Sequence, residues 1–178
     1  MGARRRASLP RWAAIILGLF TWLVLIPLAH AALPWALSRT MPRYGWAVGS
    51  PGPWNWFGII PVAFSAALLM WVLVVGIART PDRVELSLTP SFLLMRGPYG
   101  FTRNPMYVAE LGLWLGWAVF FGSAAVLIGG LVLWSLVTFV ILPREERSLE
   151  AAFGQKYRDY KSKVPRWLGI GPRSARKP

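Results

Sequence analysis

Residues that could do chemistry gather in two short polar segments of this chain. The first, residues 96–107, reads Arg-Gly-Pro-Tyr-Gly-Phe-Thr-Arg-Asn-Pro-Met-Tyr. The second, residues 143–166, contains the adjacent carboxylates Glu145 and Glu146. Nearly all of the remaining chain is apolar, so the sequence offers few other places for a reactive site.

The adjacent carboxylates of the second segment predict a cation nearby, because like charges repel unless a positive group lies between them. Taken alone, the pair also fits a solvated helix start after Pro143 that Arg144 and Arg147 neutralise. The residues that follow favour a packed helix, bent near Gly154, because apolar and aromatic residues recur every three or four positions. This face comprises Leu149, Phe153, Tyr157, Tyr160 and Val164. Both carboxylates can point toward it, since they precede Leu149 by one helical turn.

The first segment offers complementary groups. Its glycines, Gly97 among them, let backbone atoms approach a ligand closely. Tyr99 and Tyr107 supply rings with hydroxyls, and Arg103 supplies positive charge. An ordinary Gly-Pro turn with tyrosines anchored at a membrane surface would have the same composition, so both interpretations stay open.

Several kinds of catalytic and metal site are excluded, because the residues that they require are missing from the sequence. The chain has no cysteine and a single histidine, His30, so a thiol nucleophile or a histidine-rich metal site is excluded. His30 stands among alanines and is expected to be a polar residue at a membrane interface. Glu110 is different, because an ionisable group inside an apolar run is costly and is therefore a functional candidate.

The apolar remainder must position these groups within a lipid bilayer. The chain is 55% hydrophobic and 15% charged, against roughly a quarter charged in soluble domains. Charged residues are missing from 12–38, 44–78 and 111–143, and each gap exceeds the ~20 apolar residues that cross a bilayer core. The third gap is too long for one helix, and Gly122-Ser123 near its middle predicts a tight hairpin.

We therefore expect an all-α integral membrane protein. About four transmembrane helices are predicted, over approximately 12–37, 56–78, 105–121 and 124–142, and an amphipathic cytosolic helix follows them. Asn104-Pro105 supports the start of the third span, since asparagine is a good N-cap and proline suits the first helical position. The whole chain, 1–178, is read as one membrane domain with N-terminal spans in 1–95, a core in 96–167 and a basic tail in 168–178.

The positive charges predict the orientation. With four spans, all of the 20 Lys and Arg residues except Arg39 and Arg43 lie on the side of the termini. The positive-inside rule makes this side the cytoplasm, as in a bacterial-type inner membrane. The net charge of +13 does not indicate nucleic-acid binding, because the basic residues cluster at span ends, where they suit anionic lipid headgroups.

The two polar segments together resemble a known family. Gly-Pro-Tyr-x-x-x-Arg-Asn-Pro-Met-Tyr, a hydrophobic hairpin, and Glu-Glu-x-x-Leu-x-x-x-Phe-Gly-x-x-Tyr-x-x-Tyr-x-x-x-Val-Pro-Arg are similar to the isoprenylcysteine carboxyl methyltransferase and phospholipid methyltransferase superfamily. The resemblance covers about residues 96–167. Many members have histidine where this chain has Asn104, a difference that leaves the methyl acceptor open among carboxylate, amine and thiol.

The resemblance implies S-adenosylmethionine as the cofactor and a lipid or other membrane-soluble acceptor at the cytoplasmic face. The expected cofactor contacts are Gly97, Tyr99, Asn104 and Tyr107 around the adenosine, and Glu145 and Glu146 at the cationic groups. The expected catalytic residues are Glu110, Arg103 and Arg166, the arginines facing the cofactor carboxylate or an acceptor anion. No metal is expected. The alternative is a noncatalytic membrane protein whose basic tail docks anionic lipids or a partner, and a cofactor titration distinguishes the two.

Overall fold

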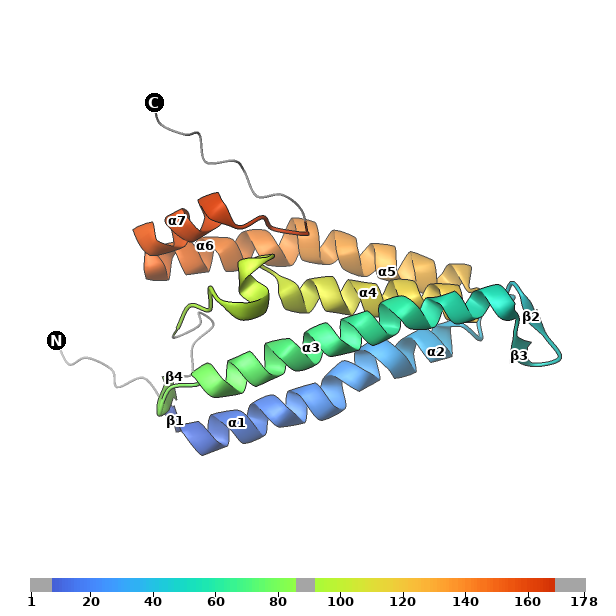
Figure 1. Ribbon diagram of the computed structural model, residues 1–178, viewed down its shortest axis with the longest axis horizontal. Coiled ribbons are helices and arrows are strands. Elements are labelled where there is room, and N and C mark those ends of the chain that lie inside the picture. The colour runs from blue at the N-terminus through green and yellow to red at the C-terminus, as the bar shows by residue number, and fades with distance from the viewer. Residues whose placement is uncertain (1–7, 86–91, 169–178) are drawn as a thin grey trace, which may run out of the picture.

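The computed structural model describes residues 8–85 and 92–168, which form a long bundle of helices (Figure 1). The first helical stretch comprises α1 (Arg11–Phe20), π-helical turns at Thr21–Leu25 and Leu28–Ala32, and α2 (Leu33–Leu37). The second comprises a 3-10 turn at Pro53–Gly58 and α3 (Ile59–Arg79). The predicted tail, residues 168–178, lies outside the described residues except for Leu168.

The second half of the chain contributes the hairpin and the C-terminal helices. The helices are α4 (Pro105–Phe121), α5 (Ala124–Leu136), a π-helical turn at Val137–Ile141, α6 (Leu142–Phe153) and α7 (Gln155–Lys163). A 3-10 turn at Gly97–Gly100 precedes α4. Two short antiparallel pairs complete the described fold: β1 (Ser8–Pro10) with β4 (Arg83–Glu85), and β2 (Trp46–Ala47) with β3 (Ser50–Pro51).

The predicted membrane character is confirmed, while the number of spans stays a prediction. In the described part of the chain three helical stretches are long and apolar enough to cross a membrane: Arg11–Leu37, Pro53–Arg79 and Ala124–Phe153. The fourth apolar helix, α4, has 17 residues, or about 25 Å at 1.5 Å per residue.

Two features of the fold differ from the sequence-based expectation. The strand pairs β1–β4 and β2–β3 add a little sheet to a fold expected to be all α. The helix of the last predicted span also does not stop near residue 142 but continues to Phe153, so no break separates it from the amphipathic helix. Pro143 has no N–H to donate, and the π-helical turn at Val137–Ile141 shifts the hydrogen-bond pattern just before it. The carboxylates of the second polar segment therefore project from a rigid extension of the membrane helix.

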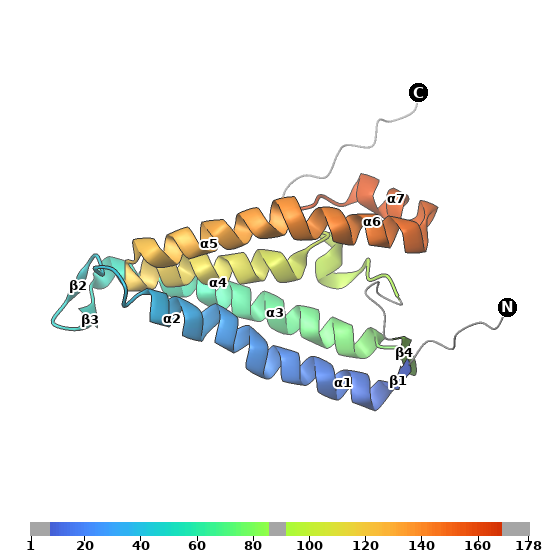
Figure 2. The same cartoon turned by 180° about the vertical axis from the view of Figure 1, so that it is seen from behind.

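Helix α4 lies between α3 and α5 and contributes more buried residues than any other described helix (Figures 1 and 2). Glycines allow α3 and α4 to approach closely: a Cβ at Gly116 would lie 2.7 Å from the Gly58 carbonyl oxygen. A larger residue would force the helices apart, because backbone atoms cannot move aside as a flexible side chain does. Close packing fixes the position of the residues at the start of α4.

The predicted hairpin between α4 and α5 is confirmed. Gly122 has a φ of +56° and ends α4 in the left-handed conformation, which glycine adopts at little cost. The Ser123 hydroxyl accepts a hydrogen bond from the Val126 N–H at 3.4 Å and caps α5. The chain thus reverses direction within the two residues between α4 and α5.

Residues 38–55, whose role the sequence leaves open, fasten this end of the bundle. Asn55 is fully buried, and its amide donates to the carbonyls of Tyr44 and Val119 at 3.1 and 3.0 Å. The indole N–H of Trp46 donates to the Phe120 carbonyl at 3.0 Å. The bonds to Val119 and Phe120 engage carbonyls in the last turn of α4, where the helix has few further N–H groups to offer them.

The fold supports a direct test of orientation. The β2–β3 hairpin and α7 lie at opposite ends of the bundle (Figure 1). Val48, in the hairpin, and Lys156, in α7, are exposed, and the chain has no native cysteine. In Val48→Cys and Lys156→Cys single variants, a membrane-impermeant thiol reagent added to intact cells is expected to label only position 48. Labelling of both positions from outside would contradict the cytoplasmic placement of the termini.

Candidate functional site

The two polar segments predicted from the sequence meet beside the start of α4. The Thr102 hydroxyl and the Asn104 side-chain amide both donate to the Arg166 carbonyl, each at 2.9 Å. The Arg103 N–H donates to the Pro165 carbonyl, also at 2.9 Å. Three hydrogen bonds therefore hold the turn before α4 against the chain that follows α7.

The amphipathic face predicted for the C-terminal helices is confirmed. Tyr157, Tyr160 and Val164 are buried as a cluster. Gly154, with a φ of +53°, separates α6 from α7 and folds the second helix back onto the first polar segment. The Tyr160 hydroxyl donates to the Tyr99 carbonyl at 2.7 Å, which ties α7 to the 3-10 turn. Burial is the main factor that raises the pKa of Tyr160, so its phenol stays neutral.

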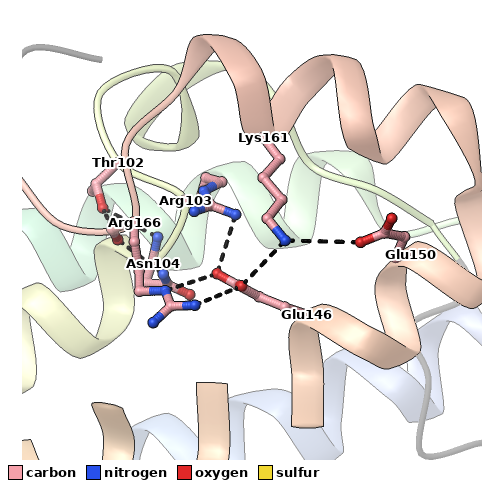
Figure 3. Close-up of polar contacts among 7 residues, drawn as sticks. All are labelled: Thr102, Arg103, Asn104, Glu146, Glu150, Lys161 and Arg166. Carbon is pink, nitrogen blue, oxygen red and sulfur yellow. Dashed lines mark hydrogen bonds and ion pairs between the residues drawn. The ribbon is translucent and has the colours of Figure 1, made fainter. Parts of the chain in front are cut away.

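Glu146 lies at the centre of three cations, as the repulsion between adjacent carboxylates predicts (Figure 3). Its side chain is 8% exposed and accepts two hydrogen bonds from Arg166, at 3.0 and 2.7 Å. Arg103 Nη1 lies 3.1 Å from Oε1, and Lys161 Nζ lies 3.7 Å from Oε2. The hydrogen bonds to Glu146 in turn raise the pKa of Arg166. The carboxylate of Glu146 is thus fully engaged with protein groups.

Glu145, its neighbour, has a different environment. It is exposed, and it accepts a hydrogen bond at 2.8 Å from the hydroxyl of Tyr107, which joins α6 to α4. Burial, and then the negative charge of Glu145, raise the pKa of Tyr99. In the described part of the chain no basic side chain lies within ion-pair distance of Glu145, so its charge is available to a ligand.

A cavity of about 320 Å³ opens between these elements. The residues predicted to act on a ligand that line it are Tyr99, Arg103, Asn104, Tyr107, Glu145 and Glu146. The rest of the wall is mainly apolar and aromatic: Phe92, Leu93, Leu94, Pro105, Met106, Ser148, Leu149, Tyr157 and Tyr160. The cavity is polar where α4 meets α6 and apolar elsewhere.

Three of the predicted residues lie outside this lining. Gly97 has a φ of +68°, and a Cβ there would lie 3.2 Å from Val75 of α3, so this glycine shapes the turn against α3. Arg166 faces Glu146. Glu110 is buried one helical turn along α4 from the cavity residue Met106.

His30, which the sequence indicated as a polar residue at a membrane interface, packs inside the helix bundle. It is buried, with 9% of its surface exposed, and its Nε2 lies 3.8 Å from Oε2 of Glu110. Sequence spacing could not reveal this pairing, because the two residues belong to helices that only tertiary packing brings together.

Sequence reasoning also missed Lys161, Thr102 and the segment 92–94. Lys161 is one of four basic residues of α7, and only the fold places it beside Glu146. Residues 92–94 precede the predicted core and carry no polar signal, yet all three line the cavity. Their apolar character between a charged loop and Arg96 was the available sign that they pack against something.

Comparisons with known proteins show which family and which individual proteins this chain resembles. The sequence model of the phospholipid methyltransferase family matches residues 55–156. An uncharacterized protein of Haemophilus influenzae is 36% identical over 63 residues, which cover 35% of this chain and 100% of that protein. Methanethiol S-methyltransferase 1 of Bradyrhizobium diazoefficiens is 36% identical over 95 residues, 51% of this chain and 28% of the relative. No solved structure matches.

Proposed function

Because the chain belongs to the phospholipid methyltransferase family, we propose that it transfers a methyl group from S-adenosylmethionine to a lipid or membrane-soluble acceptor at the cytoplasmic membrane face. One observation carries the proposal. The two polar segments meet around a cavity at the start of α4. This cavity presents a buried arginine and the carboxylate of Glu145, which has no cationic partner among the described residues.

The residues of the cavity fit such a cofactor. Its volume of about 320 Å³ falls at the lower end of the 300–1,000 Å³ typical of small-molecule sites. The Glu145 carboxylate can accept hydrogen bonds from an α-ammonium group. Arg103 Nε is buried and has no hydrogen-bond partner within residues 8–85 and 92–168, which suits an anionic group nearby. Tyr99 and Tyr107 offer faces for stacking and for a cation.

In this proposal the two adjacent carboxylates have separate roles. Glu145 binds a cationic group of the cofactor. Glu146 holds Arg103 and Arg166 in place through its ion pairs, so that Arg103 can face a carboxylate or an acceptor anion. Asn104 acts from the first polar segment, where its bond to the Arg166 carbonyl fixes the cavity wall.

The bound cofactor would supply a methyl group already activated by its sulfonium. The chain's own task is then to orient the acceptor and exclude water from it. The apolar wall, which includes Leu93, Met106 and Leu149, suits both needs. A metal ion is not required by this chemistry, and in the described residues no cluster of side chains suits one.

The acceptor determines whether a base is needed. A carboxylate acceptor releases no proton, whereas a thiol or an ammonium group must lose one. Similarity to a methanethiol S-methyltransferase keeps a thiol among the acceptor classes. Among the candidates for a base, Glu146 is engaged by three cations and Tyr99 stays protonated, which leaves Glu110 as the proposed group.

A cofactor titration tests the proposal. Purified protein in lipid nanodiscs is expected to bind S-adenosylmethionine saturably by isothermal calorimetry. It should then transfer labelled methyl groups to a component of a total membrane extract. If neither cofactor binding nor transfer is detected with folded protein, the noncatalytic alternative, a basic protein that docks anionic lipids, replaces this function.

A further inference from the structure

The buried pair of His30 and Glu110 is not part of the cavity lining, but Glu110 lies one helical turn along α4 from the cavity residue Met106. Cofactor binding does not explain this pair. His30 is in the second π-helical turn of the first span, and Glu110 is in α4. Their exposed fractions are 9% and 8%. The indole N–H of Trp117 donates to the His30 carbonyl at 2.7 Å, so the histidine backbone is fastened to the helix that carries Glu110.

The hydrogen bonds of the imidazole indicate where its proton is. His30 Nδ1 lies 3.2 Å from the Ile26 carbonyl oxygen. A carbonyl oxygen can only accept, so Nδ1 carries a hydrogen. In a neutral ring Nε2 then bears the lone pair, and Nε2 is the atom 3.8 Å from the Glu110 carboxylate. A proton taken up by this pair can therefore reside on the carboxylate or on the nitrogen 3.8 Å away.

We propose that Glu110 takes up the proton released by the methyl acceptor and that His30 is the positioning residue that shares this proton. The inference rests on the proposed methyl transfer and concerns an acceptor X–H that is a thiol or an ammonium group. Transfer forms the C–X bond and breaks the C–S bond, whose electron pair stays on sulfur. The X–H bond breaks, its electrons remain on X, and the proton goes to Glu110.

The charges around Glu110 support this direction of proton movement. The other titratable groups that act on Glu110 are Glu145 of α6 and Tyr107 of α4, and neither is a cation. Within the described residues, His30 is the basic group at ion-pair distance. An anionic carboxylate in this setting is costly unless a cation is near. A cationic methyl donor in the cavity would offset that cost before transfer, and proton uptake would neutralise the pair after it.

The single histidine makes a spectroscopic test unambiguous. In nanodisc-embedded protein labelled with ¹⁵N-histidine, without cofactor, we expect one imidazole with a protonated Nδ1 and an Nε2 resonance shifted by the Glu110 carboxyl group 3.8 Å away. In Glu110→Gln the Nε2 resonance should move, while the Nδ1 resonance stays. A protonated Nε2 with a bare Nδ1, or an Nε2 resonance unaffected by Glu110→Gln, would overturn the pairing.

Kinetics test the role of the pair in transfer to the total membrane extract. Glu110→Gln is expected to lower kcat by about 10²- to 10⁴-fold, the range for loss of a general base. His30→Ala should lower kcat by a smaller factor that added imidazole partly restores, with cofactor affinity unchanged. Ser38→Ala, a buried polar change at the end of the same helical stretch, serves as the control and should leave kcat unaffected.

The two proposals can fail separately. If wild-type protein does not bind S-adenosylmethionine, the proposed function fails whatever the imidazole spectrum shows. If wild-type protein transfers methyl groups but the product is a methyl ester, the proton-sharing role fails, because a carboxylate releases no proton. Loss of kcat in His30→Ala without any rescue by imidazole, in folded protein, would likewise reduce His30 to a packing residue.

Discussion

Glu146→Ala is expected to loosen the packing of α6 and α7 and to abolish S-adenosylmethionine binding. Its removal leaves Arg103, whose side chain is 9% exposed, buried beside Arg166 and Lys161 with no anion between them. Breaking a buried ion pair by removing one partner costs about 3–5 kcal/mol. The expected result is faster amide hydrogen exchange across α6, α7 and the residues that hold the first polar segment, measured in nanodiscs.

Glu150→Ala provides the matched control. Glu150 is on the same helix and faces Lys161 at 3.8 Å and Arg158 at 3.6 Å, but its side chain is 37% exposed. Partly exposed ion pairs contribute about 0–1 kcal/mol, so exchange should change little. Equal protection from hydrogen exchange in Glu146→Ala and the wild type would show that the ion pairs around Glu146 do not hold α6 and α7 in place.

Glu145→Gln is expected to weaken S-adenosylmethionine binding while the protein stays folded. The substitution keeps the shape and an oxygen for the Tyr107 hydroxyl but removes the charge that faces the cavity. Loss of a charge-assisted hydrogen bond costs about 1.5–3 kcal/mol, which is roughly ten- to a hundredfold in affinity. Calorimetry with S-adenosylmethionine measures the change, and hydrogen exchange of α6 should match the wild type.

Tyr107→Phe separates charge from hydrogen bonding at this position. It removes the hydroxyl that donates to Glu145 but leaves the carboxylate charged and the ring in the cavity wall. Its affinity for the cofactor should therefore fall much less than that of Glu145→Gln. If the two variants weaken binding equally, Glu145 acts by fixing Tyr107 and not by attracting a cation.

Local pattern was enough to predict much of the framework. Apolar length required membrane helices, Gly122-Ser123 marked the hairpin, and the four- and three-residue spacing from Leu149 to Val164 gave the buried face of α6 and α7. Such features depend on residues that are close in sequence. The continuity of the last helix through Pro143 was missed, because a π-helical turn that has no sequence signature precedes this proline.

The sequence by itself determined the class of the protein, the two polar segments and the chemical types of the residues in them. Composition and short-range spacing carry that information. Tertiary structure alone decided which side chains face the cavity and which face other protein groups. Successive residues of a helix point about 100° apart, so Glu145 opens to the cavity while Glu146 is enclosed by Arg103, Arg166 and Lys161. Partners such as His30 and Glu110 come from distant segments, and only the packing of whole helices brings them within reach.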